Sequence, residues 1–144
     1  MLLATSLFLS LFSTVVIIIF HYWGLRTITR FSRRFTSHFF MSVSVVIFLF
    51  LIHIIEILWY ALMLYFAFDI VGLSGFQGDT VLLPLDFLHV AASSFTTLGS
   101  LSVTPQQELA LLIDAISLTG FMMLTWSATY YYNIFSNSNL RDTY

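Results

Sequence analysis

A histidine and a glutamate lie three residues apart in the middle of a long apolar stretch. They are His53 and Glu56. Residues at this spacing share one face of a helix, so the two side chains can meet. Ionisable groups surrounded by apolar residues are rare, and they mark either a functional site or a buried hydrogen-bonded contact. Both types can ligate a metal or carry a proton, but we favour a buried polar tie between neighbouring helices.

Asp114 is the third expected member of this tie, because it also interrupts an apolar stretch. Ser93, Ser94 and His89 are further plausible partners for the pair. A single His–Glu pair is too small for a di-metal centre, which draws its ligands from four helices. We therefore predict no metal and no cofactor, apart from a possible monovalent cation. Asp86 is expected to cap a helix, since a carboxylate is favoured in a first turn.

A second pair of histidines, His21 and His38, flanks an arginine-rich segment. Two histidines on neighbouring helices could ligate a haem, so a membrane metal or haem protein stays open as an alternative. Histidines near a membrane surface are common, however, which makes this the weaker interpretation. The sequence has no Cys, no nucleophile elbow, no phosphate loop and no zinc motif. We therefore expect no enzyme activity.

The composition determines where such residues must lie. Apolar residues make up 59% of the chain and charged residues only 8%, and the mean hydropathy is +0.95. A water-soluble domain carries about 25% charged residues. The chain is therefore predicted to be an integral membrane protein without a nucleic-acid partner.

Two long apolar stretches are expected to span the bilayer before the middle of the chain. Residues 1–23 form the first predicted transmembrane helix and residues 38–68 the second, because about 20 apolar residues cross the hydrocarbon core. Residues 24–37 are predicted to be a loop, and they hold four of the five basic residues of the chain. The positive-inside rule places this loop in the cytoplasm and the N-terminus outside.

The second half is predicted to contain a helix too short to cross. After an outer loop at 69–83, Pro84 opens a short helix over 84–97, which an irregular, filter-like loop at 98–105 follows. Residues 106–135 form the third spanning helix and 136–144 a cytoplasmic tail. The fold class is thus an all-α membrane protein of the inner membrane, with three transmembrane helices and a re-entrant helix between the second and third. Irregular backbone at that depth requires protein or water around it.

The short helix and its loop resemble the pore helix and selectivity filter of potassium channels. The matching run is followed by Pro105 at the family's spacing, and it reads Ser93-Ser94-Phe95-Thr96-Thr97-Leu98-Gly99. Gly120 falls near the place where the family has a hinge glycine in its inner helix. The resemblance covers residues 38–133 and leaves the first helix outside it.

A narrower likeness is to small bacterial proteins of the two-helix ion channel family. Its features lie on both sides of the pore segment, and they are His53-Ile54-Ile55-Glu56, Trp59, Asp114-Ala115, Gly120 and Trp126-Ser127-Ala128. The resemblance implies a homotetramer with four re-entrant loops around one axis. It also implies that filter carbonyls replace the hydration shell of a cation.

The outer half of the filter departs from the family pattern. Ser100 stands at the aromatic position, Leu101 at the second glycine and Ser102 at the acidic position. Leu does not easily adopt the left-handed backbone that Gly provides. We therefore expect a cation pore with altered or lost potassium selectivity, its filter comprising Thr96, Thr97, Leu98, Gly99, Ser100, Leu101 and Ser102. The alternative is a non-conducting structural or accessory subunit, docked through its first helix in a larger membrane complex.

Overall fold

The computed structural model describes residues 2–32, 37–73, 76, 83–99 and 105–139. Within them the chain is helical. The elements are α1 (Leu2–Ser32), α2 (His38–Tyr65), a π-helical turn η1 (Phe66–Ile70), α3 (Pro84–Phe95) and α4 (Gln107–Asn139). Three of these helices are long and apolar enough to cross a membrane, as the sequence predicts. The candidate spans are Leu2–Ser32, His38–Ile70 and Glu108–Ser136.

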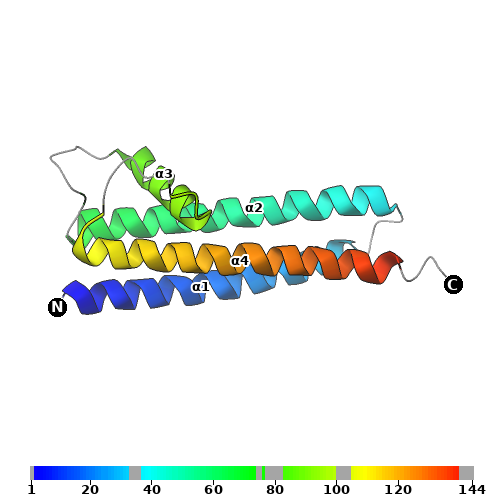
Figure 1. Ribbon diagram of the computed structural model, residues 1–144, viewed down its shortest axis with the longest axis horizontal. Coiled ribbons are helices and arrows are strands. Elements are labelled where there is room, and N and C mark those ends of the chain that lie inside the picture. The colour runs from blue at the N-terminus through cyan, green and yellow to red at the C-terminus, as the bar shows by residue number, and fades with distance from the viewer. Residues whose placement is uncertain (1, 33–36, 74–75, 77–82, 100–104, 140–144) are drawn as a thin grey trace.

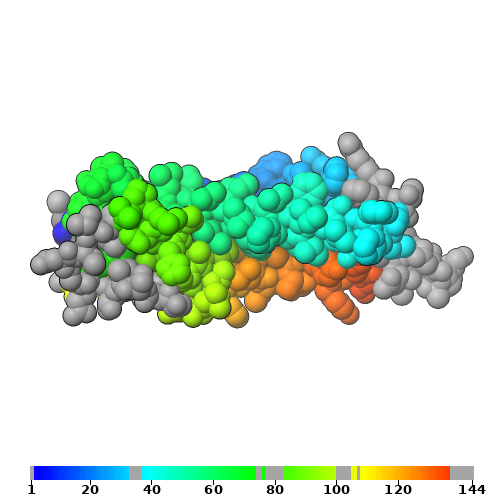
Figure 2. Space-filling view, turned by 90° about the horizontal axis from the view of Figure 1, so that it is seen from above, coloured from blue at the N-terminus to red at the C-terminus, as the bar shows by residue number. Residues whose placement is uncertain are grey.

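The three long helices form an elongated bundle (Figure 1). α1 and α4 run in the same direction side by side, and α2 runs antiparallel to both. α3 packs across α2 and α4 in the half of the bundle where α4 begins, as both views show (Figure 2). The side chains of Tyr60, Phe95 and Ile116 from these three helices are fully buried in the main core.

α1 extends beyond its expected end, which corrects the prediction of a loop over 24–37. Residues up to Ser32 are helical, with Arg26 and Arg30 exposed on the helix surface. Gly24 permits close contact with Ile52 of α2, since a Cβ there would lie 2.6 Å from the Ile52 Cδ1 atom. This packing stabilises the extra turns. Arg26 and Arg30 therefore do not mark the end of the helix.

The other predicted boundaries agree with the observed helices to within a few residues. α3 ends at Phe95, two residues before its expected end at 97, and α4 runs over 107–139 instead of 106–135. α3 begins as expected, with Pro84 in its first turn. The Asp86 carboxylate accepts a hydrogen bond from the Leu83 backbone N–H at 2.8 Å, which confirms its capping role. Most of the loops expected at 69–83 and 98–105 lies outside the described residues, as does the end of the 136–144 tail.

A row of polar contacts joins α1 to α4. The Ser6 hydroxyl donates to the Glu108 carbonyl, Thr14 and Thr119 hydroxyls lie 3.1 Å apart, and Thr29 contacts the Tyr130 hydroxyl. The buried face of α1 recurs every three or four residues, and it comprises Ser6, Leu9, Ser10, Ser13, Ile17, His21, Leu25, Ile28 and Ser32. Small side chains let two membrane helices approach closely, and hydroxyl pairs join them. One face of α1 is therefore occupied within the chain itself.

Candidate functional site: a buried histidine–glutamate cluster

Four polar side chains from the three long helices meet inside the bundle. They are His21 of α1, His53 and Glu56 of α2, and Ser127 of α4. His21 and Glu56 are fully buried, and the His53 side chain is 13% exposed. These residues form a compact group of ionisable and hydroxyl side chains in a mostly apolar interior, which we call the His–Glu cluster.

The Glu56 carboxylate stands between the two imidazoles. Its Oε1 atom lies 2.8 Å from Nδ1 of His21, and its Oε2 atom lies 2.9 Å from Nδ1 of His53. Each carboxylate oxygen therefore has one imidazole partner. A buried carboxylate is costly unless its lone pairs are engaged in this way.

Ser127 joins the opposite sides of the same two rings. Its hydroxyl lies 3.3 Å from Nε2 of His21 and 3.1 Å from Nε2 of His53. The four contacts close a ring that runs from Glu56 through His21, Ser127 and His53 back to Glu56. Both imidazoles are thus fixed in rotation, because each is held at both nitrogens.

Aromatic side chains enclose the His–Glu cluster. The His21 and His53 rings stack with centroids 5.5 Å apart. Trp126 lies against His21 at 5.4 Å, and Phe95, the last residue of α3, lies against His53 at 5.8 Å. The cluster therefore contacts all four helices and lies next to the carboxyl end of the short one.

The structure brings together only part of the tie expected from the sequence. His53 and Glu56 meet as expected, through their spacing within α2. Asp114 does not join them, because it projects from an exposed position of α4. Ser94 is buried in α3, and its hydroxyl finds no partner within the part of the chain that the structure describes.

The sequence left His21 and His38 open as a haem-ligating pair, the weaker of the interpretations. His21 is fully buried against Glu56, whereas His38 is exposed at the first residue of α2. The structure therefore does not join these two histidines into a haem site. A signal for the correct assignment exists in the sequence, since His21 continues the series Ser6, Ser10, Ser13 at helical spacing.

The carboxyl end of α3 carries the described part of the expected filter. Leu98 N–H donates to the Ser93 carbonyl at 3.0 Å, and Thr97 has φ 57° and Gly99 φ 67°. Left-handed backbone is unusual for a β-branched residue such as Thr97. Leu98 is 78% exposed at this end. Thr96 bonds back to the Ala92 carbonyl, and Ser100, Leu101 and Ser102 lie outside the described residues.

Gly120 is the point where this end of α3 meets α4. A Cβ atom at Gly120 would lie 2.0 Å from the Phe95 carbonyl oxygen, so the two backbones are in direct contact. Any side chain there would displace the end of α3. The glycine expected as a hinge thus has a packing role that is visible in the structure, within the continuous helix α4.

Comparisons with known proteins give no independent assignment. A scan against models of protein families, a search of curated proteins and a search of solved structures all find no match for this chain. The fold and the two candidate sites, the His–Glu cluster and the end of α3, are therefore interpreted from this chain's own residues.

Proposed function

We propose that this chain is a subunit of a channel-like cation pore, assembled as a homotetramer around four copies of α3. The main observation that supports this proposal is how far along α4 the carboxyl end of α3 lies. α3 has 12 residues, about 18 Å at 1.5 Å per residue, so it is too short to cross a bilayer. Its last residue contacts Gly120, thirteen residues and about 20 Å into α4. That depth supports a helix that enters the membrane and ends inside it.

The orientation of α3 favours a cation at its end. The carboxyl end of a helix carries a partial negative charge because its peptide dipoles are aligned. Thr97, Leu98 and Gly99 continue from this end as an exposed segment. In the proposed tetramer, four such ends converge on the axis, and their carbonyls replace water around the ion.

Asp114 supplies a second argument for an assembly. It is exposed on α4 within the candidate span Glu108–Ser136. A carboxylate that faces lipid inside a membrane span is unfavourable, and Asp114 lies six residues into this span. A water-filled cavity at a subunit interface removes that cost, and such a position is typical of ion pathways.

The filter composition favours weak selectivity. Ser100, Leu101 and Ser102 replace the aromatic, glycine and acidic residues of the potassium-channel pattern. We therefore propose that the pore passes monovalent cations with altered or lost preference for potassium.

The test is cation flux from liposomes that contain the purified protein. Liposomes loaded with K⁺ and diluted into Na⁺ or Cs⁺ media should discharge, and Asp114→Asn should slow the discharge. Asp69→Asn, which changes an acid in η1, is the matched control and should leave the rate unchanged. Fourfold particles in electron micrographs should accompany the flux. No flux under any gradient contradicts the pore, and a non-conducting protein bound at fixed stoichiometry to a larger complex supports an accessory subunit instead.

A further inference from the structure

We propose that the His–Glu cluster is a binding site for one divalent transition-metal ion, with Zn²⁺ as the reference ion. The ligands are Nδ1 of His21, Nδ1 of His53 and the carboxylate of Glu56. This inference does not depend on the pore, because it uses none of the residues at the end of α3. The ion would join α1 to α2 inside the bundle.

The three residues already place their ligand atoms close together. One ligand atom from each of His21, His53 and Glu56 lies within 4.8 Å of the other two. Two imidazoles and a carboxylate form a common ligand set for Zn²⁺ and Fe²⁺. Zn–ligand bonds of about 2.0–2.1 Å place tetrahedral ligands about 3.3 Å apart. The two observed N–O distances, 2.8 Å to Oε1 and 2.9 Å to Oε2, are each about half an ångström shorter than this and would have to open by that amount.

The strongest argument comes from the contacts of the two Nε2 atoms, on the side of each imidazole that faces away from Glu56. A histidine that binds metal through one nitrogen donates the N–H of the other to a fixed acceptor. Here both Nε2 atoms face the same acceptor, the Ser127 hydroxyl, at 3.3 and 3.1 Å. A hydroxyl has two lone pairs, so Ser127 can accept from both rings at once. In the metal-free cluster the Nδ1 N–H groups donate to Glu56, so metal binding requires the other tautomer, in which Nδ1 is free for the ion and both Nε2 N–H groups donate to Ser127.

The charges also favour a cation. Glu56 is fully buried, and its ion-pair partners among the described residues are the two histidines. Arg26 and Arg30 lie on exposed positions of α1, and Arg26 stacks on Trp23 instead. A divalent ion needs a negative ligand in such a medium, and Glu56 provides it.

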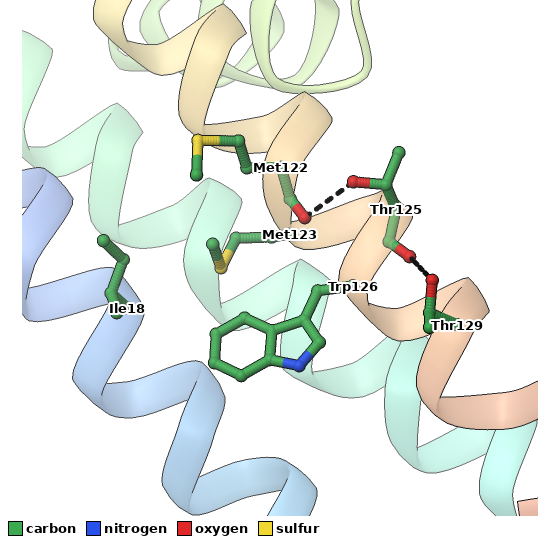
Figure 3. Close-up of a pocket in the computed structure, with 6 residues that line it drawn as sticks. All are labelled: Ile18, Met122, Met123, Thr125, Trp126 and Thr129. Carbon is green, nitrogen blue, oxygen red and sulfur yellow. Dashed lines mark hydrogen bonds between the residues drawn. The ribbon is translucent and has the colours of Figure 1, made fainter. Parts of the chain in front are cut away.

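A groove on the α1–α4 surface lies next to the cluster. Its volume is about 380 Å³, and its lining comprises Ile18, Met122, Met123, Thr125, Trp126 and Thr129 (Figure 3). The Trp126 ring borders this groove and also lies against His21, so it separates the groove from the cluster.

The experiment is metal titration of the full chain, purified without a histidine tag, stripped with chelator and kept in detergent. Co²⁺ is the probe, because its d–d absorption reports coordination, and Zn²⁺ is the competitor. We expect one Co²⁺ per chain with four- or five-coordinate bands that Zn²⁺ removes. Glu56→Gln and His53→Asn should weaken binding at least 100-fold. Ser127→Ala, which removes no ligand, should weaken it about 10–100-fold.

His89→Asn is the matched control, since His89 lies on α3 outside the cluster, and its binding should equal that of the parent. Absence of stoichiometric Co²⁺ or Zn²⁺ on the parent protein overturns the proposal without any variant, so a variant that fails to fold cannot obscure the result. Parent-like affinity in Glu56→Gln also overturns it. Liposome flux is measured separately, so the metal site and the pore can fail independently.

Discussion

At the scale of single residues, the fully buried carboxylate of Glu56 depends on its hydrogen-bond partners, because burial of an unpaired carboxylate is costly. Its two oxygens are hydrogen-bonded to Nδ1 of His21 and of His53. The Ser127 hydroxyl contacts the Nε2 atom of each ring. Buried polar groups are tolerated when every member has a partner, and losing one member leaves the others unpaired. Substitutions in the His–Glu cluster should therefore lower the stability of the protein even when they conserve side-chain volume.

Glu56→Gln should lower the stability of metal-stripped protein. The amide keeps the shape but loses the charge and replaces one acceptor oxygen with a donor, which faces an imidazole nitrogen. Loss of a charged hydrogen bond costs about 1.5–3 kcal/mol. Thermal unfolding in detergent, followed by circular dichroism, measures the effect. Asp114→Asn, at an exposed position, should leave the midpoint unchanged, and equal shifts for both variants would contradict the expectation.

Ser→Ala can be compared at two buried serines, one whose hydroxyl has hydrogen-bond partners and one whose hydroxyl has none among the residues described. Ser127→Ala removes a hydroxyl that contacts both imidazoles and should cost about 1–3 kcal/mol. Ser94→Ala removes a buried hydroxyl that has no hydrogen-bond partner among the residues described. It should be neutral or slightly stabilising, since an unpaired buried group is itself unfavourable. The unfolding midpoints of the two variants test this expectation. A larger loss of stability for Ser94→Ala than for Ser127→Ala would be inconsistent with these contacts.

At the scale of elements, the contact of α3 with α4 sets where the short helix ends. Phe95 packs its backbone on Gly120 and its ring on His53 and Tyr60. The end of α3 is thus held by α2 and α4 together. In the proposed pore, this contact positions the exposed residues that follow.

Gly120→Ala should displace the end of α3, because the added Cβ would lie 2.0 Å from the Phe95 carbonyl oxygen. Backbone cannot yield as a side-chain tip can, so we expect a loss of about 1–3 kcal/mol and loss of any flux. Gly24→Ala is the matched control. Its Cβ would meet the flexible tip of Ile52 at 2.6 Å, and alanine also favours the helix by up to about 1 kcal/mol. Similar unfolding midpoints for the two variants would argue against a rigid contact at Gly120.

At the scale of the whole molecule, the exposed surface is that of a membrane protein. Large apolar side chains cover the outer faces of α1 and α2, among them Phe8, Leu11, Phe39 and Phe50. Such a surface is unsuited to water but matches the hydrocarbon of a bilayer. The two exposed arginines of α1 lie at the end of the bundle where α4 also ends (Figure 1). The positive-inside rule predicts that this end faces the cytoplasm.

Cysteine labelling tests this orientation cleanly, since the chain has no Cys of its own. Ile70→Cys, exposed where η1 ends, should react in intact cells with a membrane-impermeant maleimide. Ser37→Cys, exposed before α2, should react only after the membrane is permeabilised. The cysteine-free parent is the control for background labelling, and the reverse pattern would invert the topology.

The sequence by itself determined the features that depend on neighbouring residues. The apolar stretches predict three long helices, because hydropathy over about 20 residues decides what a bilayer accepts. Pro84 and Asp86 indicate the start of α3, because caps act within one turn. The meeting of His53 with Glu56 follows in the same way from their spacing on one helix.

Only the tertiary structure decided which helix faces meet. His21 joins the His–Glu cluster and Asp114 stays outside it, although both interrupt apolar stretches. The difference lies in the rotation and register of α1 and α4 against α2, which small residues such as Gly24 and the serines of α1 allow. The helical extension to Ser32 likewise depends on packing against α2 and α4. Such contacts join residues from 28 positions apart, for Gly24 and Ile52, to 101 apart, for Thr29 and Tyr130. Local spacing therefore does not identify the partners.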